Sequence, residues 1–101
     1  MKKLFLSCLT LLATSLPAEV KLPGIFSDGM VLQQKQLVRV WGNAEVGEEV
    51  KVVFGEQTHS IVTDGTGQWS VTLNPMNANA QPADLVVTGK NTLTFKNVLV
   101  G

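Results

Sequence analysis

The fold is decided by one ten-residue stretch near the middle of the chain, which reads Asp64-Gly65-Thr66-Gly67-Gln68-Trp69-Ser70-Val71-Thr72-Leu73. Its first four residues predict a glycine-rich turn, because glycine reaches positive φ without steric cost. The remainder alternates, so that Trp69, Val71 and Leu73 point to one side of a strand and the polar residues to the other. Burying an indole removes on the order of 200 Å² from water, which is worth roughly 5 kcal/mol as an upper bound. We therefore expect Trp69 to lie in the core between two sheet faces.

The beginning of the chain has the pattern of a secretory signal peptide. Lys2 and Lys3 form a basic start, an apolar run follows over residues 4–13, and a cleavage region ends at Ser15 or Ala18. The apolar run is too short to span a membrane, and no later run approaches the required length. The pattern predicts a secreted or periplasmic protein, with a signal peptide at 1–18 and one domain at 19–101.

Composition limits the partners of this domain. The only cysteine, Cys8, lies in the expected signal peptide, so the domain has no disulfide to stabilise it. Without Lys2 and Lys3 there are six basic residues against eight acidic ones, which argues against a nucleic acid partner. A domain of this size buries only about 60% of its unfolded surface. We therefore expect another domain to contribute to its stability, and no membrane contact once the signal is removed.

The rest of the chain reads as short strands joined by turns, with no helical periodicity. Besides the Trp69 strand, alternation or valine content predicts strands at Leu37–Trp41, Glu49–Phe54, Gln57–Thr63, Leu85–Thr88 and Thr92–Phe95. Gly42 is expected to end the first of these strands. The dipeptide Gly55-Glu56 fits a two-residue hairpin with glycine first. These patterns predict an all-β fold, a small antiparallel β-sandwich of the immunoglobulin-like or jelly-roll-like kind, without the cysteine pair of a true immunoglobulin domain.

Three further segments carry structural expectations. The Asp28-Gly29 dipeptide predicts a tight turn with a strand on each side, and Asn74–Pro82 reads as a loop because it is polar and contains two prolines. The last apolar run, Val98-Leu99-Val100, has no stop signal after it. We expect it to form an unfinished sheet edge, which predicts poor solubility or marginal stability for the chain by itself.

The mature sequence offers no set of residues typical of an active site. A hydrolase needs a nucleophile beside a base, or a metal with several ligands. The single histidine, His59, is expected to be an exposed strand residue, and one histidine without cysteine does not make a metal site. The adjacent Glu48 and Glu49 are expected to lie in a solvated turn, since neighbours in a strand point to opposite faces. We therefore predict no catalytic, cofactor-binding or metal-binding residue in this chain.

The aspartates and one tryptophan allow structural and functional interpretations. Asp28, Asp64 and Asp84 lie beside turn signals, where short carboxylates commonly accept hydrogen bonds from the backbone. Trp41 is out of phase with the apolar face of its strand. It is therefore either an exposed platform for stacking a sugar, or a residue packed on the second sheet or on a neighbouring domain, which general burial favours.

Four segments carry a resemblance to a known family. The sequence resembles the start of bacterial sialate O-acetylesterases at Ile25–Gln34, Val38–Gly42 with Gly47-Glu48, Thr66–Leu73 and Asn91–Gly101. These segments follow the family's order over nearly the whole mature chain. The departures are Gly29, Arg39 and Val46, where the family has asparagine, proline and proline, and they affect turn details.

The resemblance implies that these residues form the non-catalytic N-terminal domain of a secreted esterase. In the family, an SGNH-type domain follows, and its serine attacks an acetyl ester of sialic acid or a related glycan with help from histidine and aspartate. None of those catalytic residues falls within residues 1–101, so we expect the downstream esterase domain to be the partner and the acetylated glycan to be the substrate of the parent enzyme. The alternative is a carbohydrate-binding or structural β-sandwich module with no enzymatic activity.

Overall fold

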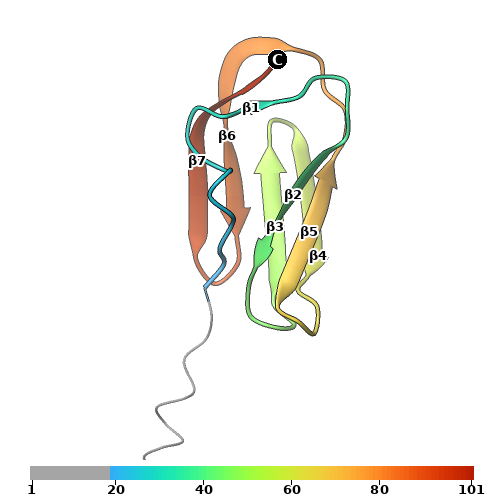
Figure 1. Cartoon of the computed structure of the whole chain (residues 1–101), viewed down its shortest axis with the longest axis vertical. Helices are drawn as coiled ribbons and strands as arrows, with labels where there is room; N and C mark the ends of the chain where they lie inside the picture. Colours follow the sequence, from blue (N-terminus) through green and yellow to red (C-terminus); the bar gives the residue numbers. More distant parts are fainter. Residues whose placement is uncertain (1–18) are drawn as a thin grey trace, which may run out of the picture.

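Seven strands build the domain in the computed structural model, which describes residues 19–101 (Figure 1). The expected signal peptide lies outside the described residues. The strands are β1 (Val31–Leu32), β2 (Val38–Asn43), β3 (Glu49–Phe54), β4 (Gln57–Val62), β5 (Gln68–Leu73), β6 (Asn79–Thr88) and β7 (Thr92–Val100). The expected all-β sandwich is confirmed.

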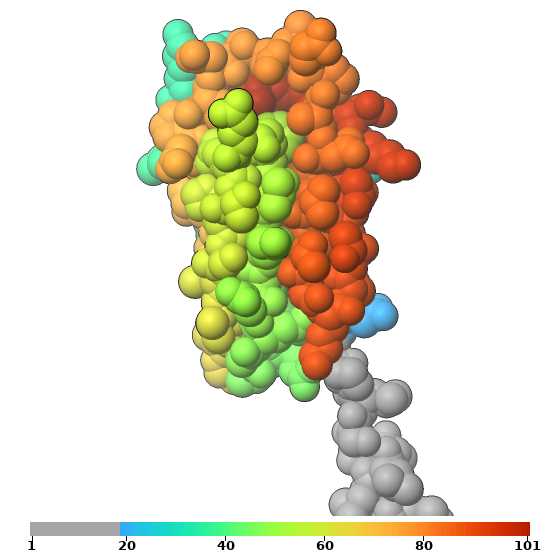
Figure 2. All heavy atoms as spheres, turned by 180° about the vertical axis from the view of Figure 1, so that it is seen from behind, coloured from blue at the N-terminus to red at the C-terminus, as the bar shows by residue number. Residues whose placement is uncertain are grey.

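The strands form two sheets of unequal width. The larger sheet has the order β1-β7-β6-β3-β4, and the smaller one pairs β2 with β5. In Figure 1, β2 and β5 lie in front of β3 and β4, whereas the segment that precedes β1 runs in front of β6 and β7. Figure 2 shows the rear face, where β4, β3, β6 and β7 lie side by side. The N-terminal segment therefore covers the half of the large sheet that the small sheet leaves open.

The N-terminal segment is held to the small sheet by backbone pairing. Lys21 N donates to Asn43 O and Asn43 N donates to Lys21 O, each at 2.9 Å. β2 continues past Gly42 to Asn43, which also pairs with Gln68 of β5, so the expectation that Gly42 ends the strand is wrong. The physical reason is close approach, because a Cβ on Gly42 would overlap the carbonyl oxygen of Lys21. Glycine here admits a neighbouring backbone rather than terminating a strand.

The local turns follow the sequence closely. β3 and β4 are joined through Gly55-Glu56, with Phe54 opposite Gln57 and Gly55 at φ 59°, which confirms the predicted hairpin. The turn before β5 places Gly67 at φ 82°. These turns depend on residues adjacent in sequence, which explains why the strands on either side begin close to the expected positions.

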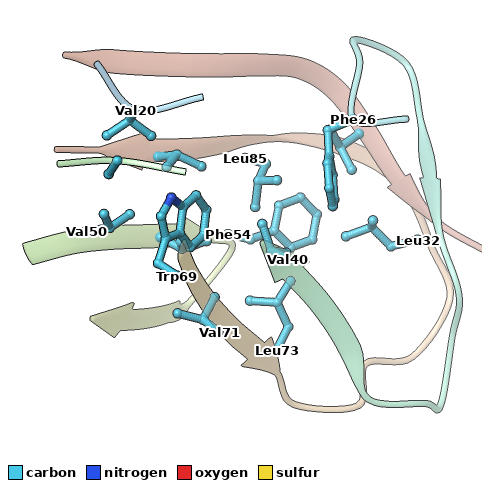
Figure 3. Close-up of a cluster of buried hydrophobic side chains, with 14 of the residues drawn as sticks. Val20, Phe26, Leu32, Val40, Val50, Phe54, Trp69, Val71, Leu73 and Leu85 are labelled. Atoms are coloured by element: carbon cyan, nitrogen blue, oxygen red, sulfur yellow. The ribbon is translucent and has the colours of Figure 1, made fainter. Parts of the chain in front are cut away.

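The core forms between the two sheets and the N-terminal segment (Figure 3). Trp69 is only 3% exposed, and Val71 and Leu73 are buried with it, as the alternation predicted. The indole nitrogen of Trp69 donates to Asn43 O at 3.2 Å, so its polar atom is satisfied. The buried side chains from the rest of the fold include Val20, Phe26, Leu32, Val40, Val50, Phe54, Leu85 and Val98.

The C-terminal end of the chain differs from the expectation. β1 pairs with β7 in parallel, with Val31 opposite Leu99 and Leu32 opposite Val100. The large sheet is therefore mixed rather than purely antiparallel, and the last run is not an open edge. The turn at Asp28-Gly29 does precede β1, but no strand lies between residue 19 and the turn, so that expectation is wrong in part.

The boundaries of β6 and β7 also differ from the expectation. β6 begins at Asn79, inside the segment expected to be a loop, and β7 runs from Thr92 to Val100 as one strand. The pairing of the two strands shifts register between Asn79 and Ala83 and again between Ala83 and Leu85. Such irregularities tolerate Pro82 in a strand, because the missing amide hydrogen falls where the ladder is already interrupted.

Candidate functional site

An apolar groove between the N-terminal segment and the start of β2 is the candidate site. It has a volume of about 280 Å³. The described residues include six large hydrophobic side chains that are exposed, and three of them, Ile25, Val31 and Leu37, line this groove. Each of the three is at least 60% exposed. A concentration of exposed apolar side chains in one hollow is typical of a binding surface rather than of a solvated one.

The floor of the groove is formed by aromatic side chains. Phe26 is buried and meets the half-buried Trp41 edge to face, with ring centroids 5.0 Å apart and planes at 78°. The guanidinium carbon of Arg39 lies 5.0 Å from the centroid of the Trp41 ring, and Arg39 Nε donates to Ser70 Oγ at 3.3 Å. Trp41 is thus packed against Phe26 of the N-terminal segment and against Arg39. A sugar-stacking platform presents an open ring face, which this packing reduces.

Hydrogen bonds to β7 hold the outer wall of the groove. Gly29 N donates to Lys96 O at 2.7 Å, and the Asp28 carboxylate accepts from Lys96 N at 2.8 Å. Leu99 N donates to Met30 O at 3.0 Å. The Asp28-Gly29 turn is therefore attached to a strand almost seventy residues away in sequence, and the groove is a formed feature of the fold.

The other aspartates differ in their contacts. Asp64 Oδ1 accepts from Thr66 Oγ1 at 2.6 Å, from Thr66 N at 2.8 Å and from Gln68 N at 3.0 Å. These bonds, that of the Thr66 hydroxyl above all, lower the pKa of Asp64, because they stabilise the charged form. The expected backbone bonding is therefore confirmed for Asp28 and Asp64. Asp84 is exposed in β6 and makes no such bond within residues 19–101.

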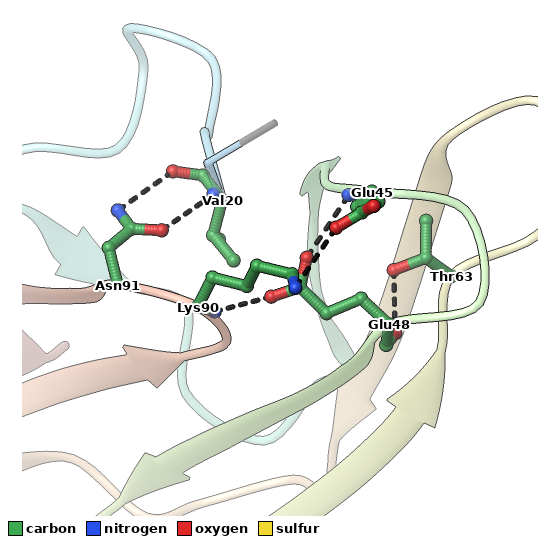
Figure 4. A network of polar contacts seen from close by, with 6 residues as sticks. All are labelled: Val20, Glu45, Glu48, Thr63, Lys90 and Asn91. Carbon is green, nitrogen blue, oxygen red and sulfur yellow. Dashed lines mark hydrogen bonds and ion pairs between the residues drawn. The ribbon is translucent and has the colours of Figure 1, made fainter. Parts of the chain in front are cut away.

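A polar network joins the turn at Glu45–Glu48, before β3, to the β6–β7 turn at Lys90 (Figure 4). The Glu48 carboxylate accepts hydrogen bonds from Glu45 N, at 3.1 Å, and from Lys90 N. The Lys90 ammonium also pairs with the Glu45 carboxylate at 3.1 Å. Glu49 is exposed as expected, but it begins β3 rather than lying in a turn. Glu48 is half-buried rather than solvated, because the backbone of the β6–β7 turn reaches its carboxylate.

The single histidine contacts its own strand. His59 lies in β4 and is half-buried rather than exposed. Its Nε2 lies 2.9 Å from Gln57 Oε1. Within residues 19–101, no three histidine, cysteine, aspartate or glutamate side chains lie together as metal ligands would. The described part of the chain contains no helix that is both long and apolar enough to cross a membrane.

Sequence reasoning missed the groove. Ile25, Met30 and Val31 are apolar residues in an apolar segment, and such residues read as core. Only the folded structure shows that Phe26 and Leu32 point inward while Ile25 and Val31 point outward. The stretch in which buried and exposed positions alternate is too short for the sequence to show which residues share a face.

Comparison with solved structures shows which class of protein the domain is related to. The domain is a small β-sandwich whose exposed apolar groove lies beside its last residue, and it has a counterpart among solved structures. A carbohydrate acetylesterase from Xanthomonas citri matches 81% of this chain with 36% identity and a TM-score of 0.77. The chain is thus related to a carbohydrate esterase, and it covers 19% of that enzyme's length. No protein-family profile matches the chain, and no curated protein matches it by sequence.

Proposed function

We propose that this chain is the non-catalytic β-sandwich domain of a secreted or periplasmic esterase of the sialate O-acetylesterase type. In this proposal, the enzyme removes O-acetyl groups from sialic acids or related glycans by SGNH-type serine chemistry. The catalytic residues belong to a separate esterase domain, and residues 19–101 support and position that domain.

One observation carries the proposal. The domain shares both its fold and more than a third of its aligned residues with a carbohydrate acetylesterase of which it covers 19%. At 36% identity the two chains are similar in sequence as well as in fold, which supports a relationship between them. The sequence segments that resemble sialate O-acetylesterases support the finer assignment, and the basic and apolar start of the chain supports export.

The proposal is tested on the gene and on the protein. We expect the reading frame to continue beyond the codon for Gly101 into a serine esterase domain. The protein encoded by the longer frame should release acetate from O-acetylated sialic acid, and the 101-residue chain should release none above background. A stop codon directly after Gly101, or acetate release by the 101-residue chain, would contradict the proposal.

The alternative of a carbohydrate-binding module is tested separately. Trp41 is the aromatic residue that a glycan would contact, and its fluorescence would report binding. We expect titration of the 101-residue chain with acetylated and deacetylated glycans to give no saturable change. Saturable binding that is lost in Trp41→Ala and kept in Trp69→Phe would favour the binding module instead.

A further inference from the structure

We infer that the apolar groove of Ile25, Phe26, Met30, Val31, Leu37 and Trp41 is the surface on which the esterase domain docks. The inference rests on the proposed function, because that function supplies the partner. It adds a specific site, since nothing in the proposed function says which face of the domain contacts the catalytic part.

The first support is the chemistry of the groove. Ile25 is 66%, Val31 60% and Leu37 68% exposed. Together they expose apolar surface to water, which is unfavourable and is relieved by burial against a partner. Arg39 is the one charged residue among the groove's lining. Gln33 and Gln36 also line it and are polar but uncharged. The matching surface is therefore mainly apolar, with a carboxylate or carbonyl oxygen placed to accept from the Arg39 guanidinium. Aromatic residues, methionine and arginine are the types enriched in protein interfaces, and the groove contains Phe26, Trp41, Met30 and Arg39.

The second support is the position of the last residue. Gly101 N donates to Leu32 O at 3.0 Å, and Gln34 N donates to Gly101 O at 3.1 Å. A Cβ on Gly101 would lie 3.4 Å from a methyl carbon of Val31. Figure 1 shows the C-terminus beside β1. A polypeptide attached at Gly101 therefore starts at the rim of the groove, where a short connection gives an effective concentration in the millimolar range.

The third support is that the groove requires no ordering before it binds. Its wall is bonded to β7 through Asp28, Gly29 and Met30, and its floor is the buried Phe26 ring. A surface that is already formed loses little conformational entropy on docking. Most of the chain of the similar carbohydrate acetylesterase lies outside the part that this domain matches. In the proposed enzyme, the corresponding part would fill the groove.

The groove contains its own probes, because Met30 and Trp41 are both oxidisable and half-buried. Met76 is a matched control, since it is also half-buried but does not line the groove. The experiment compares hydroxyl-radical oxidation of these side chains in the 101-residue chain and in the longer protein encoded by the gene. We expect Met30 oxidation to fall about fivefold in the longer protein while Met76 changes less than about twofold, because oxidation follows exposure.

Two variants of the longer protein identify the surface. Leu37→Asp places a charge in the groove and should restore Met30 oxidation to the rate of the 101-residue chain. Val46→Asp is the control, because Val46 is 60% exposed and lies outside the groove, and it should leave Met30 protected. Thermal unfolding should show the two domains melting together in wild type and in Val46→Asp, but separately in Leu37→Asp.

The outcomes separate the two claims. Equal oxidation of Met30 in the two proteins, in a longer protein that does release acetate, would overturn the docking surface and leave the proposed function intact. A gene that encodes no esterase domain would overturn both. Protection of Met30 that rises with the concentration of the 101-residue chain alone would overturn the inference in favour of a second copy of this chain as the occupant.

Discussion

The side-chain amide of Asn91 binds both backbone polar groups of Val20, a residue 71 positions earlier in the chain. Asn91 Oδ1 accepts from Val20 N at 2.7 Å, and Asn91 Nδ2 donates to Val20 O at 3.3 Å (Figure 4). Val20 is 1% exposed and belongs to the core. The Asn91 side chain therefore makes the two hydrogen bonds that a neighbouring strand would make to Val20. It attaches the start of the domain to the β6–β7 turn.

Asn91→Ala should destabilise the domain because it leaves the amide and carbonyl of a buried residue without partners. We expect a loss of about 1–3 kcal/mol in the free energy of unfolding, measured by urea denaturation. The control is Asn77→Ala, in the exposed loop between β5 and β6, which should change stability by less than about 0.5 kcal/mol. Equal effects of the two substitutions would show that the Val20 contacts contribute nothing.

Gly42→Ala should be costly although alanine is small. A Cβ at this position overlaps the Lys21 carbonyl oxygen, so β2 and the N-terminal segment would have to separate. We expect a loss of about 2–3 kcal/mol, read from the thermal midpoint and urea curves.

Gly24→Ala is the matched control for Gly42→Ala. A Cβ at Gly24 meets nothing within 4 Å, and its φ is not positive. We expect this change to be neutral or to stabilise the domain by about 0.5 kcal/mol, because it restricts the unfolded chain. A Gly42→Ala domain as stable as Gly24→Ala would contradict the close approach of Lys21.

Trp69→Phe should weaken the core more than Trp41→Phe. Trp69 is 3% exposed and loses both volume and its hydrogen bond to Asn43 O, whereas Trp41 is half-buried at the groove. We expect a loss of about 2–3 kcal/mol for Trp69→Phe and less than about 1 kcal/mol for Trp41→Phe, by denaturant unfolding followed by circular dichroism. The reverse order would mean that the core is centred elsewhere.

Asp64 should titrate below the ordinary aspartate value of 3.8. The folded pKa is lowered, so the stabilisation that the carboxylate provides is present above the unfolded pKa and is lost as the pH falls through the folded pKa. Titration of the side-chain carboxyl carbon by NMR measures the folded value directly. Thr66→Val removes the largest cause and should raise the pKa of Asp64 toward 3.8, while a midpoint at or above 3.8 in wild type would contradict the turn geometry.

Much of the fold could be predicted because its signals are local. β3 was predicted with its observed bounds, and β4 and β5 to within a residue, since alternation and glycine turns depend on residues that are adjacent in sequence. The burial of Trp69 followed from the same alternation. The all-β class followed from the absence of any helical period.

The errors fall where pairing is long-range. The parallel pairing of β1 with β7 joins Val31 to Leu99, and no turn between them signals it. The early start of β6 at Asn79 depends on Val100, its partner at the far end of the next strand, β7. Local sequence contains the polar residues and prolines of a loop there, and the sheet overrides them.

The amino-acid sequence by itself therefore determined the central strands, from β2 to β5, their inward faces and the resemblance to an esterase, because each of these is written in neighbouring residues. Only the tertiary structure decided which apolar residues remain outside. Ile25 and Phe26 are adjacent and both apolar, yet one is 66% and the other 8% exposed. The difference arises because the Asp28-Gly29 turn bonds to Lys96, which fixes the segment so that one side chain faces the core and the other faces the groove.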